Sequence, residues 1–159
     1  MLLAGCGARD YVLGEGNFFL IMTNMQFYPQ QYLDSKIDLD VFMYALEDIQ
    51  GETHLCGVRK SSAEYGCTCG QDTIIGFLLD YDGELPAPRN QSTNDGDKAW
   101  VHLTGRLVSD QKQDIEIHAY LPDGSVDPDR TETISFLSFR VDSWSTIEDA
   151  SALAYYVSK

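Results

Sequence analysis

The sequence predicts a mainly β fold: a small antiparallel barrel, closed or nearly closed, with one amphipathic helix near its N-terminus. Three observations support this fold class. The chain has 159 residues, within the usual size of one domain. Apolar residues recur at helical spacing once and then mostly at the two-residue spacing of strands. Six predicted strands and one helix favour a barrel over alternating strands and helices.

The first residues resemble the end of a bacterial lipoprotein signal. Leu3-Ala4-Gly5-Cys6 matches the lipobox, in which small residues precede the cysteine that carries the lipid. A complete signal has a basic start and an apolar run of about 7–15 residues, so we expect only its end to be present. We therefore predict lipidation at Cys6, a tether over residues 7–14, one domain over 15–159 and a location on the outer face of the cell membrane.

The helix is predicted over Gly16–Gln26. Its apolar residues follow helical spacing, and Pro29 lies just beyond its end. After it the period changes to two. In Ile37–Met43 the apolar side chains alternate with Asp38 and Asp40, as in a half-buried strand.

Five further strands are predicted, most of them bounded by glycine, proline or asparagine turns. They are His54–Arg59, Thr73–Tyr81, Ala99–Val108, Asp114–Leu121 and Thr133–Val141. Asp82–Lys98 is predicted to be a polar loop at one end of the barrel. The tail Ile147–Lys159 fits either a short helix or an extended segment packed on the barrel.

The charge balance argues against two classes of partner. With 25 acidic and 11 basic residues, the formal net charge is −14. So acidic a surface repels phosphate backbones and anionic lipid headgroups. We therefore expect no binding to nucleic acid, and contact with the membrane only through the lipid anchor.

Three cysteines after Cys6 are the strongest candidates for chemistry. Cys56 follows His54 by two residues, and Cys67 and Cys69 come shortly before Asp72. Thiolate, imidazole and carboxylate groups can together bind zinc, but structural zinc sites usually have Cys-x₂₋₄-Cys pairs, which are not found here. An oxidising exterior favours a disulfide from Cys56 to Cys67 or Cys69. Unpaired, buried thiols are the third possibility.

Other residues give weaker signals. His102 and His118 lie on predicted strands and are expected to be half-exposed strand residues. The acidic stretch from Asp123 to Asp129 has part of the spacing of a calcium loop. However, Pro128 replaces the glycine that such a loop needs, so a solvated turn is expected. No nucleophile motif is present, and we expect no catalytic residues.

Three stretches resemble the C-terminal domain of the YcgQ-type membrane proteins, which are expected to act beside a permease. They are Tyr32–Leu39, Cys67–Asp72 followed by Gly76-Phe77, and Trp100–Gly105. The similarity would cover roughly residues 15 to 145. The family usually has two adjacent cysteines, whereas Thr68 separates Cys67 from Cys69 here. The resemblance implies an OB-like barrel, an extracytoplasmic position and a transport-accessory role.

The leading prediction is therefore a lipid-anchored binding or interaction module, accessory to a permease. OB-like barrels bind with the face of their second and third strands and the flanking loops. Here this face lies near Cys56, Cys67, Cys69 and the loop Asp82–Lys98. The rivals are a zinc protein using the cysteines with His54 or Asp72, a thiol-redox enzyme built on Cys67 and Cys69, and a structural envelope protein.

Overall fold

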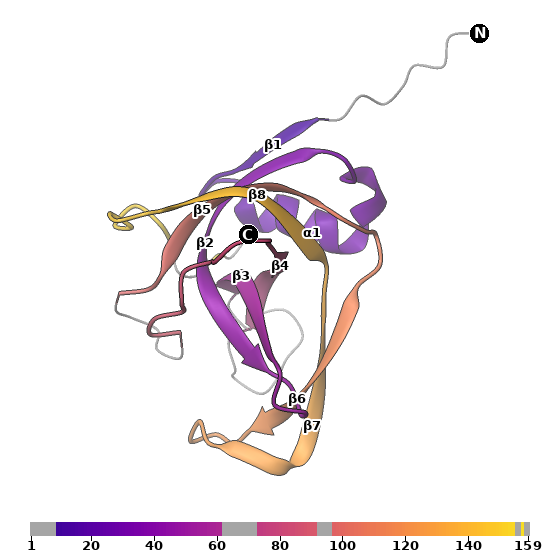
Figure 1. Ribbon diagram of the computed structural model, residues 1–159, viewed down its shortest axis with the longest axis vertical. Coiled ribbons are helices and arrows are strands. Elements are labelled where there is room, and N and C mark those ends of the chain that lie inside the picture. Colours follow the sequence, from indigo (N-terminus) through magenta and orange to yellow (C-terminus); the bar gives the residue numbers. More distant parts are fainter. Residues whose placement is uncertain (1–8, 62–72, 92–96, 155–156, 158–159) are drawn as a thin grey trace, which may run out of the picture.

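The computed structural model describes residues 9–61, 73–91, 97–154 and 157. Its elements are β1 (Asp10–Leu13), α1 (Phe18–Phe27), a short 3-10 helix η1 (Pro29–Gln31), β2 (Lys36–Glu47), β3 (Thr53–Ser61), β4 (Thr73–Asp80), β5 (Trp100–Leu107), β6 (Gln113–Tyr120), β7 (Val126–Phe136) and β8 (Ser138–Thr146). The prediction of a mainly β fold with a helix near the N-terminus is confirmed (Figure 1).

Five strands close on themselves into a ring in the order β2-β3-β4-β8-β5. The long strand β2 closes it, because its first half pairs with β5 and its second half pairs with β3. Neighbouring strands of the ring are antiparallel except β4 and β8, which are parallel. The short strand β1 pairs in parallel with the first part of β2, Lys36–Leu39.

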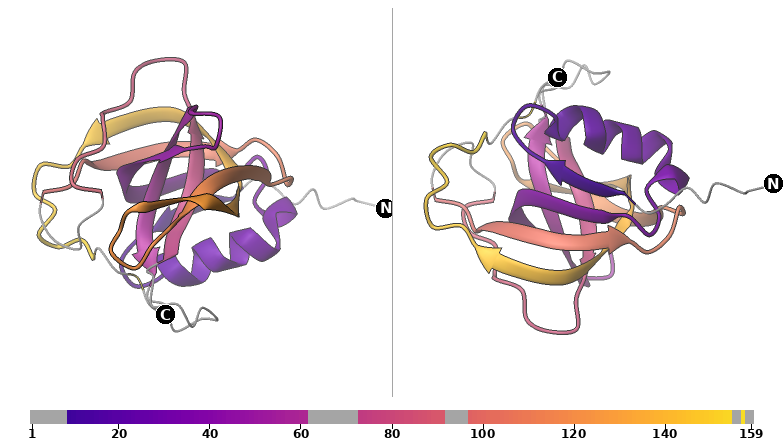
Figure 2. Two further views of the ribbon diagram at one scale, coloured as in Figure 1. Left: turned by 90° about the horizontal axis from the view of Figure 1, so that it is seen from below. Right: turned by 90° about the horizontal axis from the view of Figure 1, so that it is seen from above.

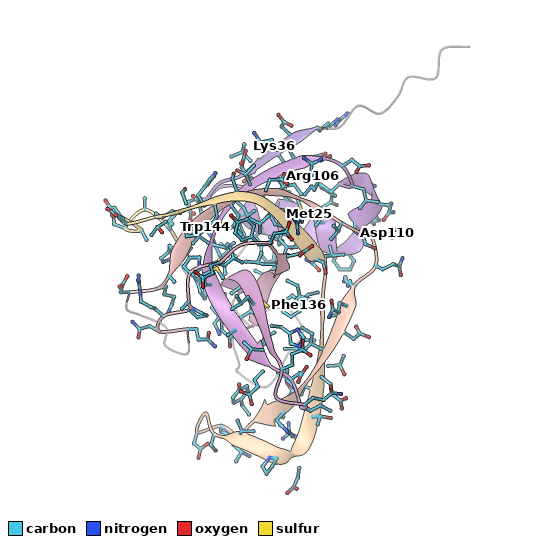
Figure 3. The ribbon with its side chains drawn as sticks, in the orientation of Figure 1. Met25, Lys36, Arg106, Asp110, Phe136 and Trp144 are labelled. Carbon is cyan, nitrogen blue, oxygen red and sulfur yellow. The ribbon has the colours of Figure 1, made fainter. Side chains whose placement is uncertain are left out.

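Side chains alternate between the inside and the outside of this ring, as the period of two predicts. Ile37, Leu39, Val41 and Met43 of β2 all lie in the main buried cluster. Helix α1 covers one end of the ring and contributes Phe18, Met22 and Met25 to the same cluster. Figure 2 shows the helix lying alongside the strands, and Figure 3 shows Met25 within the packed region.

A second buried cluster lies on the outer face of β2, β3 and β4. There the sheet residues Phe42, Cys56 and Leu78 pack with Ile115 and Ile117 of β6 and with further residues of the cluster. Strands β6 and β7 form a separate two-stranded sheet at the opposite end of the molecule from α1 (Figure 1). The β6–β7 hairpin thus covers apolar surface that the ring alone would expose.

Two glycines allow strands of the ring to approach closely. A Cβ atom on Gly76 would lie 2.0 Å from the carbonyl oxygen of Gly57, and one on Gly105 would lie 2.0 Å from that of Arg140. Real Cβ atoms never approach backbone so closely, so these positions require glycine.

Arg59 is a fully buried cation on β3. Its guanidinium forms an ion pair with Glu15 at 2.6 Å and donates hydrogen bonds to the carbonyl oxygens of Asp40 and Ala154. The group also lies over the rings of Phe18 and Trp100, at 4.5 and 5.3 Å from their centroids. Arg59 therefore joins the segment before α1, the ring and the C-terminal tail.

Three predicted boundaries differ from the structure. Residues 10–13 of the expected tether form β1. The single strand expected over Thr133–Val141 is divided between β7 and β8, which are separated by Leu137 alone. The described tail residues 147–154 form no helix. Instead, Ile147, Ala150 and Leu153 pack on the outer cluster. Tyr155 and Tyr156, which the extended alternative places against the barrel, lie outside the described residues.

None of the helices in the described ranges is both long and apolar enough to cross a membrane.

Candidate functional site

A groove opens where β3 and β4 separate. Strand β4 pairs with β3 as far as Leu78, opposite Cys56, and then continues along β8 to Asp80. The start of β3 pairs only with β2, so the two strand ends diverge. The groove has a volume of about 550 Å³ and is lined by Thr53, His54, Leu55, Leu78, Leu79, Asp80, Val108, Gln113 and Ser138.

The β2–β3 turn borders this groove. The carboxylate oxygen Oδ1 of Asp48 accepts hydrogen bonds from the backbone N–H groups of Gln50 and Glu52, each at 2.9 Å. Gly51 has a positive φ of 84°, which glycine adopts without strain. The backbone N–H of Ile49 donates to the carbonyl of Glu116 in β6 at 2.9 Å. The turn is therefore fixed internally and also bonded to the β6–β7 hairpin.

Asp48, Glu52 and His54 bring three metal-ligating groups together at this turn. One donor atom from each lies within 4.8 Å of the other two. His54 Nε2 and Asp48 Oδ2 are 2.9 Å apart. The hydrogen bond from His54, helped by the backbone N–H of Glu52, holds the pKa of Asp48 below its ordinary value. These residues could hold a cation, since they offer one imidazole nitrogen and two carboxylate oxygens.

His54 is a ligand candidate already from its residue type, but its partners in the structure differ from those expected. The cysteines and Asp72 were the expected partners, whereas Asp48 and Glu52 lie beside it. Cross-strand pairing alone does not bring Asp48 to His54, because the register places Leu46 opposite His54. What the sequence does show is three metal-ligating residue types within seven positions around the Gln50-Gly51 turn.

Cys56 is a free and fully buried thiol. Cys56 thus forms no disulfide within the described residues, and its expected partners, Cys67 and Cys69, lie outside them. Burial raises the pKa of the Cys56 thiol to about 12, so its sulfur remains protonated at neutral pH. The thiol packs among the apolar side chains of the outer cluster instead of facing a ligand. The other predicted site residues, Cys6, Cys67, Cys69 and Asp72, lie outside the described residues.

The remaining two histidines are half-buried strand residues, as expected. His102 Nδ1 lies 2.7 Å from Asp40 Oδ1, and its Nε2 lies 3.6 Å from Asp38 Oδ1. The two carboxylates thus contact different nitrogens of one ring. The polar turn predicted from Asp123 to Asp129 is only partly present. Asp123 Oδ1 accepts a hydrogen bond from the backbone N–H of Ser125, but Asp127 and Asp129 lie in strand β7.

Comparisons of this chain with protein-family models, with curated proteins and with solved structures gave no match.

Proposed function

We propose that this chain is a binding module built on an OB-like barrel, with the groove between β3 and β4 as its ligand site. The order of strands in the ring carries the proposal. OB folds are five-stranded, partly open Greek-key barrels that bind with the face of strands two and three and the loops beside it. In the ring, β3 and β4 are the second and third strands, and the groove lies where they separate.

The flanking connections support the same site. The loop between the first two strands of the ring is the Asp48–Glu52 turn, and the connection between the fourth and fifth strands contains the β6–β7 hairpin. These two connections are hydrogen-bonded through Ile49 and Glu116. They correspond to the two loops that border the ligand in OB-fold proteins.

The lining of the groove favours an uncharged polar ligand. Leucine side chains form part of its wall, while Thr53, Gln113 and Ser138 offer hydroxyl and amide groups. Its Asp80 is paired with Arg140 at 3.2 Å, which reduces the charge it presents. A short saccharide or peptide would pair with such groups and would not need a cationic wall.

Blocking the groove tests this proposal. A panel of short oligosaccharides and peptides would be screened against the wild type by thermal shift, and the ligands found would be titrated by calorimetry. Gln113→Trp should abolish their binding because Gln113 lines the groove. The matched control is Gln111→Trp, two residues earlier and also exposed, which should bind normally. Equal binding by both variants would place the ligand elsewhere.

The anchoring part of the proposal concerns Cys6. We propose that the intact protein is lipidated there and presents its barrel outside the cell, beside a permease. The lipobox-like residues before Cys6 and the similarity to the YcgQ-type domain support this role. A fatty-acid probe added to growing cells should label the full-length wild type and not Cys6→Ala. Equal labelling of the two proteins would contradict it.

A further inference from the structure

We propose that Asp48, Glu52 and His54 form a binding site for one divalent transition-metal ion, with zinc the best match, at the rim of the groove. This inference goes beyond the proposed function and does not depend on it. It rests on the geometry of the β2–β3 turn, on the kinds of donor atom and on a second histidine that serves as an internal comparison.

The spacing of the donor atoms fits a shared ion. Zinc bonds to nitrogen and oxygen at about 2.0–2.2 Å, so two ligands of one ion lie about 3.0 to 3.5 Å apart. The distance of 2.9 Å between His54 Nε2 and Asp48 Oδ2 is close to this range. Glu52 is already within 4.8 Å, and its exposed side chain can rotate to close the remaining gap.

Two of the three ligands are held in position by the fold. Oδ1 of Asp48 is occupied by two backbone N–H groups, which leaves Oδ2 directed at His54. Hydrogen bonds of this kind orient metal-binding carboxylates. His54 is fixed in β3 by its pairing with Leu46 of β2. Binding therefore mainly orders Glu52, and the ion takes the place of the hydrogen bond between His54 Nε2 and Asp48 Oδ2, with neutral His54 carrying its ring proton on Nδ1.

The donor set favours zinc over calcium or magnesium. Calcium takes six to eight oxygen ligands, and magnesium is bound mostly by oxygen and retained water. Imidazole nitrogen favours zinc and its neighbours in the transition series. Two carboxylates balance the charge of the ion, and three protein ligands leave an open coordination position. Because His54 also lines the groove, this open position lies beside the proposed ligand site.

The surroundings of His102 show why proximity alone does not make a site. Asp40 and Asp38 lie 2.7 and 3.6 Å from His102, but they contact its two different ring nitrogens. A metal at either nitrogen would be out of reach of the carboxylate on the other side. At the β2–β3 turn, by contrast, one donor atom from each of the three residues can face a common point.

Calorimetry on chelator-treated protein tests the proposal, with zinc chloride alone as the probe. The background is Cys67→Ser/Cys69→Ser, which removes two thiols from competition. Cys56 needs no change, because its thiol is fully buried. We expect one zinc ion per chain. Glu52→Gln and His54→Gln should each weaken binding by about tenfold or more. The matched control His102→Gln should bind zinc as the parent protein does.

Cobalt chloride identifies the types of ligand atom. The visible spectrum of the cobalt-bound protein should show nitrogen and oxygen coordination without thiolate charge-transfer bands. The proposal fails if no zinc binds below about 1 mM, the weak limit of extracellular cation sites. It also fails if binding survives both Glu52→Gln and His54→Gln, or if the cysteine substitutions abolish it. Glu52 is exposed, so Glu52→Gln remains informative even if His54→Gln does not fold. Gln113→Trp should still bind zinc, which separates this test from that of the groove.

Discussion

Arg59 is the largest fully buried side chain in the described part of the chain, and its contacts explain how a charge is accommodated there. Glu15 neutralises it, two backbone carbonyl oxygens accept hydrogen bonds from its N–H groups, and two aromatic rings lie against it. No sequence pattern predicts this role, because Arg59 simply ends a predicted strand. Only the closure of the ring brings Glu15 and Ala154 to it.

Replacing Arg59 should strongly destabilise the protein. Arg59→Ala leaves a cavity between Phe18 and Trp100 and removes the hydrogen bonds to the carbonyl oxygens of Asp40 and Ala154, so we expect a loss of about 3 kcal/mol or more. Urea denaturation measures this loss. Arg106→Ala is the control, because Arg106 pairs with Asp142 on the exposed surface. Its cost should be below about 1 kcal/mol. Equal losses for the two variants would contradict the structural role of Arg59.

Cys56 should resist alkylation in the folded protein. Only the thiolate reacts, and a thiol with a pKa of about 12 is ionised to about one part in ten thousand at pH 8. Iodoacetamide labelling followed by peptide mass spectrometry should find Cys56 unmodified in buffer and fully modified in urea. Rapid labelling without urea would show that the outer cluster does not protect this sulfur.

The residues of the candidate site show how far sequence reasoning reaches at this scale. The residue types alone drew attention to His54, since histidine beside cysteine is typical of metal sites. The partners of His54 were missed because they lie in the turn, where Asp48 and Glu52 look like ordinary solvated residues. The length of the turn and its bonding to Oδ1 of Asp48 decide which side chains meet, and neither can be derived from composition.

At the scale of elements, period and turn chemistry located most strands correctly. The boundary between β7 and β8 was missed because no glycine, proline or asparagine marks it, only Leu137. The chain passes there from the two-stranded sheet directly into the ring, and Figure 3 shows Phe136 at this passage. Strand β1 was missed because four residues are too few to show a period. Its partner β2, not its own pattern, makes it a strand.

The β6–β7 hairpin should contribute to stability by covering the outer cluster. Ile117→Ala removes a buried side chain from its contacts with the ring and should cost about 2 to 4 kcal/mol. The same variant should speed the alkylation of Cys56, because a weakened hairpin opens more often. Val126→Ala, a half-exposed residue of β7, is the control and should change neither quantity appreciably. Unchanged Cys56 labelling in Ile117→Ala would mean that the hairpin does not gate access to the thiol.

At the scale of the whole molecule, the closed ring depends on the alternation of residues within strands, which the sequence shows, and on the pairing between strands, which it does not show. The alternation of apolar and polar residues predicted which side chains of a strand face inward. The order of the strands in the ring depends instead on pairing between distant parts of the chain. The pairing of β2 with both β3 and β5, and of β4 with β8, joins residues far apart in the chain. Such pairings leave no local pattern, so a mainly β fold could be expected from the sequence, but the order of the strands in the ring could not.

Net charge is also a property of the whole molecule, and it leads to a prediction about nucleic acids. OB-like barrels, the class proposed above for this chain, commonly bind oligonucleotides. Affinity for a phosphate backbone, however, depends on basic residues that displace its counterions. This chain has 11 basic and 25 acidic residues, and several of its basic groups are already paired, including Arg59 with Glu15 and Arg140 with Asp82.

We therefore expect no measurable binding of single-stranded DNA or RNA at physiological salt. Fluorescence anisotropy with a labelled random oligonucleotide at about 0.15 M salt measures this directly. Lowering the salt tenfold should not restore binding, because reduced screening strengthens repulsion between like charges. An OB-fold protein known to bind single strands serves as the positive control. Submicromolar affinity would contradict the prediction. It would also mean that a local basic surface outweighs the net charge, and that the groove should be tested with oligonucleotides first.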